Sequence, residues 1–142
     1  MQFSRFQKIV LGISGFTAFA IGCFILLSPL AFYSGYGISL EQDASLLSEL
    51  RAPGAGLAAF GVIMLLGLFR KAIAPVSIVV ALTVYLAFPI GRIVGMVMDG
   101  IPSGSVLGAL LVEIVVACLL LAAFGRNRLR VPATERFLNV AS

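Results

Sequence analysis

The sequence predicts an all-α integral membrane protein that forms a four-helix bundle. Of its 142 residues, 61% are hydrophobic and 11% are charged, whereas soluble domains carry about 25% charged residues. Four apolar runs are each long enough to cross a hydrocarbon core of ~30 Å. Basic residues gather on alternate sides of these runs, as the positive-inside rule describes for membrane proteins.

The first membrane helix is predicted over residues 9–30. Its apolar run is longer than the ~7–15 residues of a signal-peptide core, and no small-residue cleavage site follows it, so we expect the helix to be retained. The connection to the second helix is the longest in the membrane domain and contains Phe32, Tyr33 and Tyr36. Aromatic rings that carry hydroxyl groups are typical of a membrane–water interface.

The other three helices are predicted over residues 45–70, 72–98 and 105–124. Pro53 predicts a local bend or unwinding of the second helix, because proline has no N–H for the carbonyl four residues earlier. Residues 99–104 are dense in turn-forming residues and predict a short hairpin between helices three and four. These two helices are therefore expected to be antiparallel neighbours.

The distribution of charge predicts that both termini lie in the cytoplasm. Residues 1–124 are expected to form the membrane domain and residues 125–142 a basic cytoplasmic tail. Eight of the ten Lys and Arg residues lie at the N-terminus, in the second loop or in the tail: Arg5, Lys8, Arg70, Lys71, Arg126, Arg128, Arg130 and Arg136. An even number of crossings places the first connection and the hairpin on the opposite, periplasmic side.

Three charged side chains lie inside the predicted membrane helices: Arg51, Arg92 and Glu113. At 1.5 Å rise per residue they lie ~9, ~9 and ~12 Å from the periplasmic ends of their helices, and so at one level. Because helices three and four are neighbours, we expect Arg92 and Glu113 to form an ion pair. Tyr85 and Asp99 share the helix face of Arg92, and Tyr85 lies deeper, at the floor of this cluster.

The cluster has more than one interpretation. Buried charges are usually satisfied pairs, so it can be a structural ion pair or triad that holds the helices in register. It can instead be a ligand site, because two arginines against one glutamate leave a positive charge that suits the carboxylate or phosphate of a small anion or lipid head group. Proton relay through Glu113 is the third interpretation, although a neighbouring arginine holds a carboxylate ionised.

Enzymatic chemistry, cofactors and metal ions are not expected. The chain has no histidine, and Cys23 and Cys118 lie in separate apolar runs, which is not a zinc or haem pattern. The sequence contains no phosphate-binding loop and no nucleophile elbow. Basic residues outside the spans match membrane topology and anionic lipid rather than nucleic acid.

Polar motifs occur in a fixed order along the chain: Ser48-Glu49-Leu50-Arg51-Ala52, Gly91-Arg92, Asp99-Gly100-Ile101-Pro102-Ser103, and Glu113 in the last span. Over residues 5–124 this pattern resembles the bacterial membrane family catalogued as domain of unknown function 4345. The resemblance implies a small four-helix protein of the bacterial inner membrane and implies no mechanism. Pro53 departs from the pattern, in which another residue type is expected.

The leading hypothesis is a non-enzymatic membrane protein whose Arg/Glu site binds a small anion or a lipid head group near the periplasmic side. One alternative is an accessory or structural subunit of a larger membrane complex. Another is a small proton-coupled transporter, which would work as a dimer. The expected partners are therefore the lipid bilayer, the bound head group or anion, and a second membrane protein or a second copy of the chain.

Overall fold

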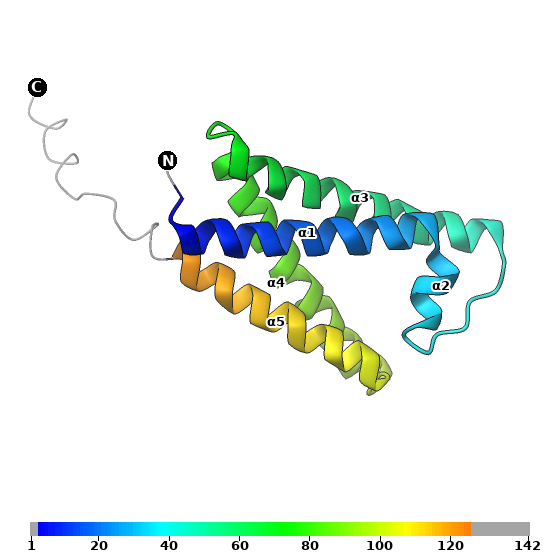
Figure 1. The fold of residues 1–142 in the computed structure, drawn as a ribbon. Coiled ribbons are helices and arrows are strands. Elements are labelled where there is room, and N and C mark those ends of the chain that lie inside the picture. Colours follow the sequence, from blue (N-terminus) through cyan, green and yellow to red (C-terminus); the bar gives the residue numbers. More distant parts are fainter. Residues whose placement is uncertain (1–2, 126–142) are drawn as a thin grey trace, which may run out of the picture.

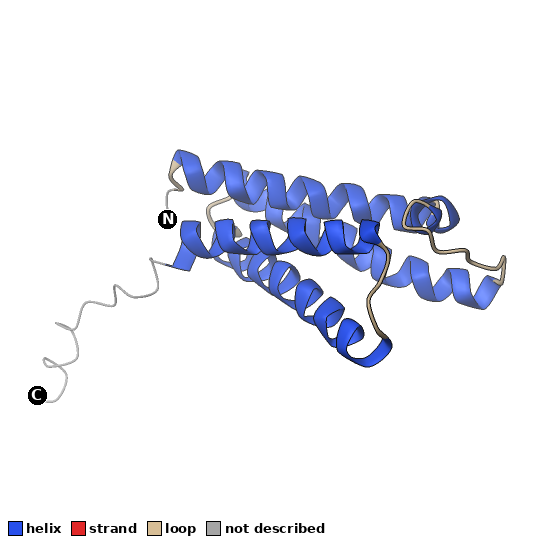
Figure 2. Ribbon diagram, turned by 90° about the horizontal axis from the view of Figure 1, so that it is seen from below, coloured by secondary structure: helices blue, strands red, loops and turns tan. Residues whose placement is uncertain are grey.

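The computed structural model describes residues 3–125, so the predicted basic tail lies outside the described residues except for Gly125. This part of the chain consists of helices and their connections (Figures 1 and 2). Four helices are long and apolar enough to cross a membrane, which confirms the predicted all-α class. The helices are α1 (Arg5–Leu27), α2 (Pro29–Ser34), α3 (Ala44–Phe69), α4 (Ala74–Asp99) and α5 (Gly104–Phe124).

The first long helix lies closer to the N-terminus than the sequence analysis predicted. It begins at Arg5 because Ser4 and Gln7 form a capping box, in which each backbone N–H donates to the other residue's side-chain oxygen. It ends at Leu27 because Ser28 leaves the helical conformation (φ −140°, ψ 64°) before Pro29. A residue that precedes proline is disfavoured in the α conformation.

The connection between α1 and α3 contains the short helix α2, which the sequence analysis did not predict. Pro29 occupies its first turn, where the missing N–H of proline costs no helical hydrogen bond. Gly37 follows in the left-handed region (φ +74°), which favours glycine and reverses the chain. The Oγ of Ser103 donates a hydrogen bond of 2.9 Å to the carbonyl of Tyr36, so this connection is tied to the α4–α5 turn.

Helix α3 runs without interruption through Pro53, so the predicted unwinding is wrong. Asp43 caps the helix by accepting a hydrogen bond of 2.8 Å from the N–H of Leu46. Pro53 is exposed, whereas Gly54 next to it and Leu57 one turn later are buried. The packing of these residues keeps the backbone helical beyond the proline.

Helices α1 and α3 are the most closely packed pair in the bundle. Glycines allow this approach: a methyl group on Gly22 would overlap the backbone of Ala58, and one on Gly61 would overlap the backbone of Phe19. Small residues at helix contacts are the usual means by which membrane helices come close. The contact between α1 and α3 is therefore made by closely approaching backbones at these glycines rather than by large side chains.

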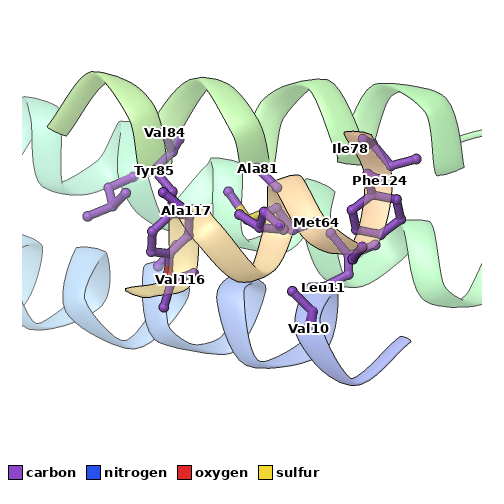
Figure 3. Packing of buried hydrophobic residues seen from close by; sticks show 14 residues of the cluster. Val10, Leu11, Met64, Ile78, Ala81, Val84, Tyr85, Val116, Ala117 and Phe124 are labelled. Atoms are coloured by element: carbon purple, nitrogen blue, oxygen red, sulfur yellow. The ribbon is translucent and has the colours of Figure 1, made fainter. Parts of the chain in front are cut away.

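The hydrophobic core lies toward the end of the bundle where α1 begins and α5 ends, which we call the N-terminal end. Leu11, Met64 and Leu120 are fully buried there, among the cluster that Figure 3 shows. The Nε2 of Gln7 donates a hydrogen bond of 2.7 Å to the carbonyl of Ala123, which joins the start of α1 to the end of α5.

The helices separate toward the other end of the bundle, which we call the α2 end. There the α4–α5 hairpin diverges from α1 and α3, and α2 lies beside the separation (Figure 1). Helix α5 packs against α4 and α1 but not against α3. The bundle is therefore closed at its N-terminal end and spread at its α2 end.

Candidate functional site

Arg92 of α4 and Glu113 of α5 form the ion pair that the sequence predicts. The Nε of Arg92 donates to both carboxylate oxygens of Glu113, at 2.9 Å to Oε2 and 3.1 Å to Oε1. The side chains are 29% and 16% exposed, so both are half-buried. It is the one ion pair found within residues 3–125. The turn between Asp99 and Gly104 brings the two helices together and makes the pair possible.

The ion pair leaves most of the guanidinium group free. Within the described part of the chain, the terminal nitrogens of Arg92 have no hydrogen-bond partner. No fully buried side-chain nitrogen or oxygen atom there lacks a partner, so these nitrogens are accessible. A guanidinium carries five N–H donors, of which the terminal nitrogens hold four. Arg92 can therefore donate to a second acceptor while it remains paired with Glu113.

Arg92 and Glu113 line a cavity of about 470 Å³ at the α2 end of the bundle. Most of its lining is apolar and comes from all four long helices, including Ile21, Val84 and Phe88. A volume of this size and an apolar lining with few polar groups are typical of pockets for small organic ligands. The structure thus combines one charged hydrogen-bonding group with a mainly hydrophobic wall.

The divergence of the α4–α5 hairpin and a run of small residues create this cavity. Gly108 and Ala109 line it from α5, and Ala18 lines it from α1. A Cβ added to Gly108 would meet no atom within 4 Å, so the space beside it is open.

Aromatic side chains of α2 and the segment after it cover part of the cavity. Phe32, Tyr33 and Tyr36 all line it. The ring of Phe32 lies 5.2 Å from that of Tyr33 and 5.1 Å from that of Tyr36, at distances typical of favourable aromatic pairs. From the sequence these residues were expected at the membrane interface, and the cavity that they line was not predicted. The dipeptide Ser28-Pro29, a common helix-start signal, could have revealed α2.

Tyr85 also lines the cavity, on the side nearer the hydrophobic core, and is 5% exposed (Figure 3). Its hydroxyl donates a hydrogen bond of 2.9 Å to the carbonyl of Ser14 in α1. The predicted position of Tyr85 deeper than Arg92 matches this arrangement. However, its hydroxyl ties α4 to α1 and makes no hydrogen bond with Arg92 or Glu113.

Arg51 does not join the cluster, so the predicted triad is wrong. Its side chain is exposed, makes no ion pair within residues 3–125 and does not line the cavity. The equal depth predicted from the helix ends did not bring Arg51 near Glu113, because α3 packs against α1 and α4 and not against α5. Without Arg51, the predicted surplus of positive charge disappears, and the site has one arginine for one glutamate.

Asp99 lies at the last position of α4 and is exposed. It does not line the cavity and makes no side-chain hydrogen bond within the described residues. The shared helix face with Arg92 was therefore insufficient to place it in the site, because Asp99 lies beyond the packed part of α4.

The fold and the site together define a class of protein: a small four-helix protein able to span a membrane, with one half-buried ion pair beside an apolar cavity. Residues 6–124 match the family described as Domain of unknown function (DUF4345). The chain belongs to this family, as the order of its polar motifs indicated. Searches of curated proteins and of solved structures found no match.

Proposed function

We propose that this protein binds an amphiphile with an anionic head group in the cavity beside Arg92 and Glu113. The observation that carries the proposal is the free terminal edge of the Arg92 guanidinium in a mainly apolar cavity of about 470 Å³. A carboxylate or phosphate head would accept hydrogen bonds from that edge. The apolar part of the ligand would contact Ile21, Ile25 and Val84, which line the same cavity.

An amphiphile suits the cavity better than a small inorganic anion does. With Arg51 outside the site, Glu113 balances the charge of Arg92, so electrostatic attraction alone offers little to a small anion. An apolar chain would add van der Waals contacts with the cavity wall, which are the main packing force within a membrane. The ligand is therefore expected to depend on both its head group and its chain.

The test uses the purified full-length protein in detergent and two ligands with the same alkyl chain, a carboxylic acid and its methyl ester. Gly108→Leu would place a side chain in the open space of the cavity while it retains both residues of the ion pair. We expect the wild type to bind the acid at least tenfold more tightly than the ester, because hydrogen bonds to a charged group contribute about 1.5–3 kcal/mol. We expect Gly108→Leu to lose this binding in native mass spectrometry.

Gly104→Leu is the matched control. This glycine starts the same helix, has open space around it and does not line the cavity. It should bind the acid as the wild type does. Equal binding by Gly108→Leu and Gly104→Leu, or no preference of the wild type for the acid, would contradict the proposal.

We also propose that the protein lies in the bacterial inner membrane with both termini in the cytoplasm. The support is that Arg5, Lys8, Arg70 and Lys71 all lie at the N-terminal end of the bundle, which the positive-inside rule assigns to the cytoplasm. The cavity and α2 would then lie in the half of the membrane nearer the periplasm.

Cysteine labelling tests this orientation in a variant in which Cys23 and Cys118 are replaced by alanine. A new cysteine at Ser39, in the exposed segment after α2, should react with a membrane-impermeant maleimide in spheroplasts. A new cysteine at Lys71 should react only after the membrane is permeabilised. The reverse pattern would show the opposite orientation, and equal labelling of intact spheroplasts at both positions would contradict a four-span topology.

A further inference from the structure

We propose a second binding site, at the N-terminal end of the bundle, for an anionic phospholipid. Its phosphate would lie between the ammonium groups of Lys8 and Lys71, and one acyl chain would follow an apolar groove beside Phe69. The proposal does not depend on the Arg92 site, because the two sites lie at opposite ends of the bundle and share no lining residue.

The head-group part of this site is a cavity of about 330 Å³. It is lined by Phe3, Lys8, Gly67, Leu68, Phe69, Lys71 and Ala74. The two lysines come from α1 and from the turn after α3, segments far apart in sequence, and no acidic residue lines the cavity. Each ammonium group carries three N–H donors, and lysine binds phosphate as a compact point charge. The charge and donors of the cavity therefore complement a phosphate group.

The acyl-chain part is a smaller groove of about 150 Å³, lined by side chains of α1 and α3. Its lining is entirely apolar and consists of Phe19, Val62, Leu65, Leu66 and Phe69. Phe69 lines both the cationic cavity and this groove, and it is 82% exposed. Val62 lies seven residues before Phe69 in α3, or about 10 Å along the helix, toward the middle of the bundle.

The adjacency of the two hollows identifies the ligand as a lipid rather than a soluble phosphate. A soluble phosphate would use the lysines and leave the groove empty. A phospholipid places a phosphate at the membrane surface and a chain toward the membrane centre, which is the direction from Lys8 and Lys71 to Val62. An anionic lipid is favoured over a zwitterionic one because the cavity contributes two positive charges and no negative charge.

The first experiment measures lipid binding by native mass spectrometry of the full-length protein in detergent. Phosphatidylglycerol and phosphatidylcholine with identical chains are titrated against the wild type, the double variant Lys8→Gln/Lys71→Gln, and the control double variant Arg5→Gln/Arg70→Gln. Both variants remove two positive charges from the same end of the bundle, but Arg5 and Arg70 do not line the cavity. We expect the lysine variant to lose phosphatidylglycerol affinity by on the order of tenfold and the arginine variant to retain it.

The second experiment changes the groove and leaves the charges intact. Val62→Trp would fill the groove with a larger side chain, and Val79→Trp on α4 is the control, because Val79 is exposed at a position outside both hollows. We expect Val62→Trp to weaken phosphatidylglycerol binding several-fold and Val79→Trp to leave it unchanged. Circular dichroism and gel filtration of each variant establish that it is folded.

Any one of three results would overturn the proposal. Equal losses in the lysine and arginine double variants would mean that diffuse charge attracts the lipid without a site. Displacement of phosphatidylglycerol by an equal concentration of inorganic phosphate would mean that the ligand is a soluble phosphate. Unchanged binding in Val62→Trp would remove the groove from the site. Phosphatidylglycerol is itself an anionic amphiphile, so both titrations are also made in the Arg92→Gln background, where the first proposed site is disabled. The same losses in that background would assign the binding to the lysine cavity, so the failure of one proposal is distinguishable from the failure of the other.

Discussion

Replacing Gly22 with alanine is expected to lower the free energy of unfolding by about 3 kcal/mol, the upper end of the range for overpacked cores. The added methyl group would overlap the backbone of Ala58 and the carbonyl oxygen of Gly54 in α3. Backbone atoms cannot rotate away as a flexible side chain can, so α1 and α3 would have to separate along their whole contact. Thermal or denaturant unfolding of the purified protein in detergent, followed by circular dichroism, measures this loss.

Gly12→Ala is the matched control in the same helix. An added methyl group there would lie 3.5 Å from the side chain of Leu68, which is an ordinary van der Waals contact. Because alanine favours helix over glycine by roughly 0.5–1 kcal/mol, this substitution should be neutral or stabilising. Similar unfolding midpoints for Gly12→Ala and Gly22→Ala would contradict the close approach of the two helices.

Replacing Arg92 with glutamine is expected to weaken binding of the anionic amphiphile at least tenfold, and replacing Glu113 with glutamine is expected to strengthen it. Loss of the guanidinium removes the donors proposed for the head group, and about 1.5–3 kcal/mol of charged hydrogen bonding corresponds to a loss of affinity of about 10- to 150-fold. Neutralising Glu113 removes the negative charge that competes for Arg92. Affinities measured by native mass spectrometry with the acid and its methyl ester would show these opposite changes.

The stability of the same variants separates a ligand site from a purely structural ion pair. Arg92→Gln leaves the half-buried carboxylate of Glu113 without its partner, and we expect a cost of about 1–3 kcal/mol, less than for a fully buried pair because both side chains are partly exposed. Arg51→Gln is the control and should change neither stability nor binding, since Arg51 is exposed and outside the cavity. A parallel loss of binding in Arg92→Gln and Glu113→Gln would instead favour the structural interpretation.

The class of fold and the Arg92–Glu113 pair were predictable because they depend on local features. Four long apolar runs specify helices of membrane-spanning length whatever their arrangement. A four-residue connection, residues 100–103, forces α4 and α5 to be neighbours, so charges at matching depths in these two helices meet. Helices α4 and α5 are adjacent both along the chain and in the folded structure, so the sequence alone indicates their contact.

Arg51 shows where this reasoning fails. Counting residues from the helix ends predicted the same depth for Arg51 as for the pair, but depth is only one coordinate, and the lateral order of helices in the bundle is another. That order depends on which helix faces allow the closest approach, here the glycine faces of α1 and α3 at Gly22 and Gly61. Hydrophobic periodicity does not reveal it, because in an apolar chain nearly every helix face is hydrophobic.

By itself, the sequence determined that the chain forms four helices able to span a membrane and that one arginine and one glutamate meet between the last two. The tertiary structure alone decided that Arg51 lies outside this site, that α2 covers an apolar cavity, and that two lysines share a second hollow. The physical reason is that hydrophobic runs and turn-forming residues determine local structure, whereas cavities form where packed helices diverge in space. The spread of the α4–α5 hairpin from the glycine-packed α1–α3 pair is such a divergence, and the proposed ligand site lies within it.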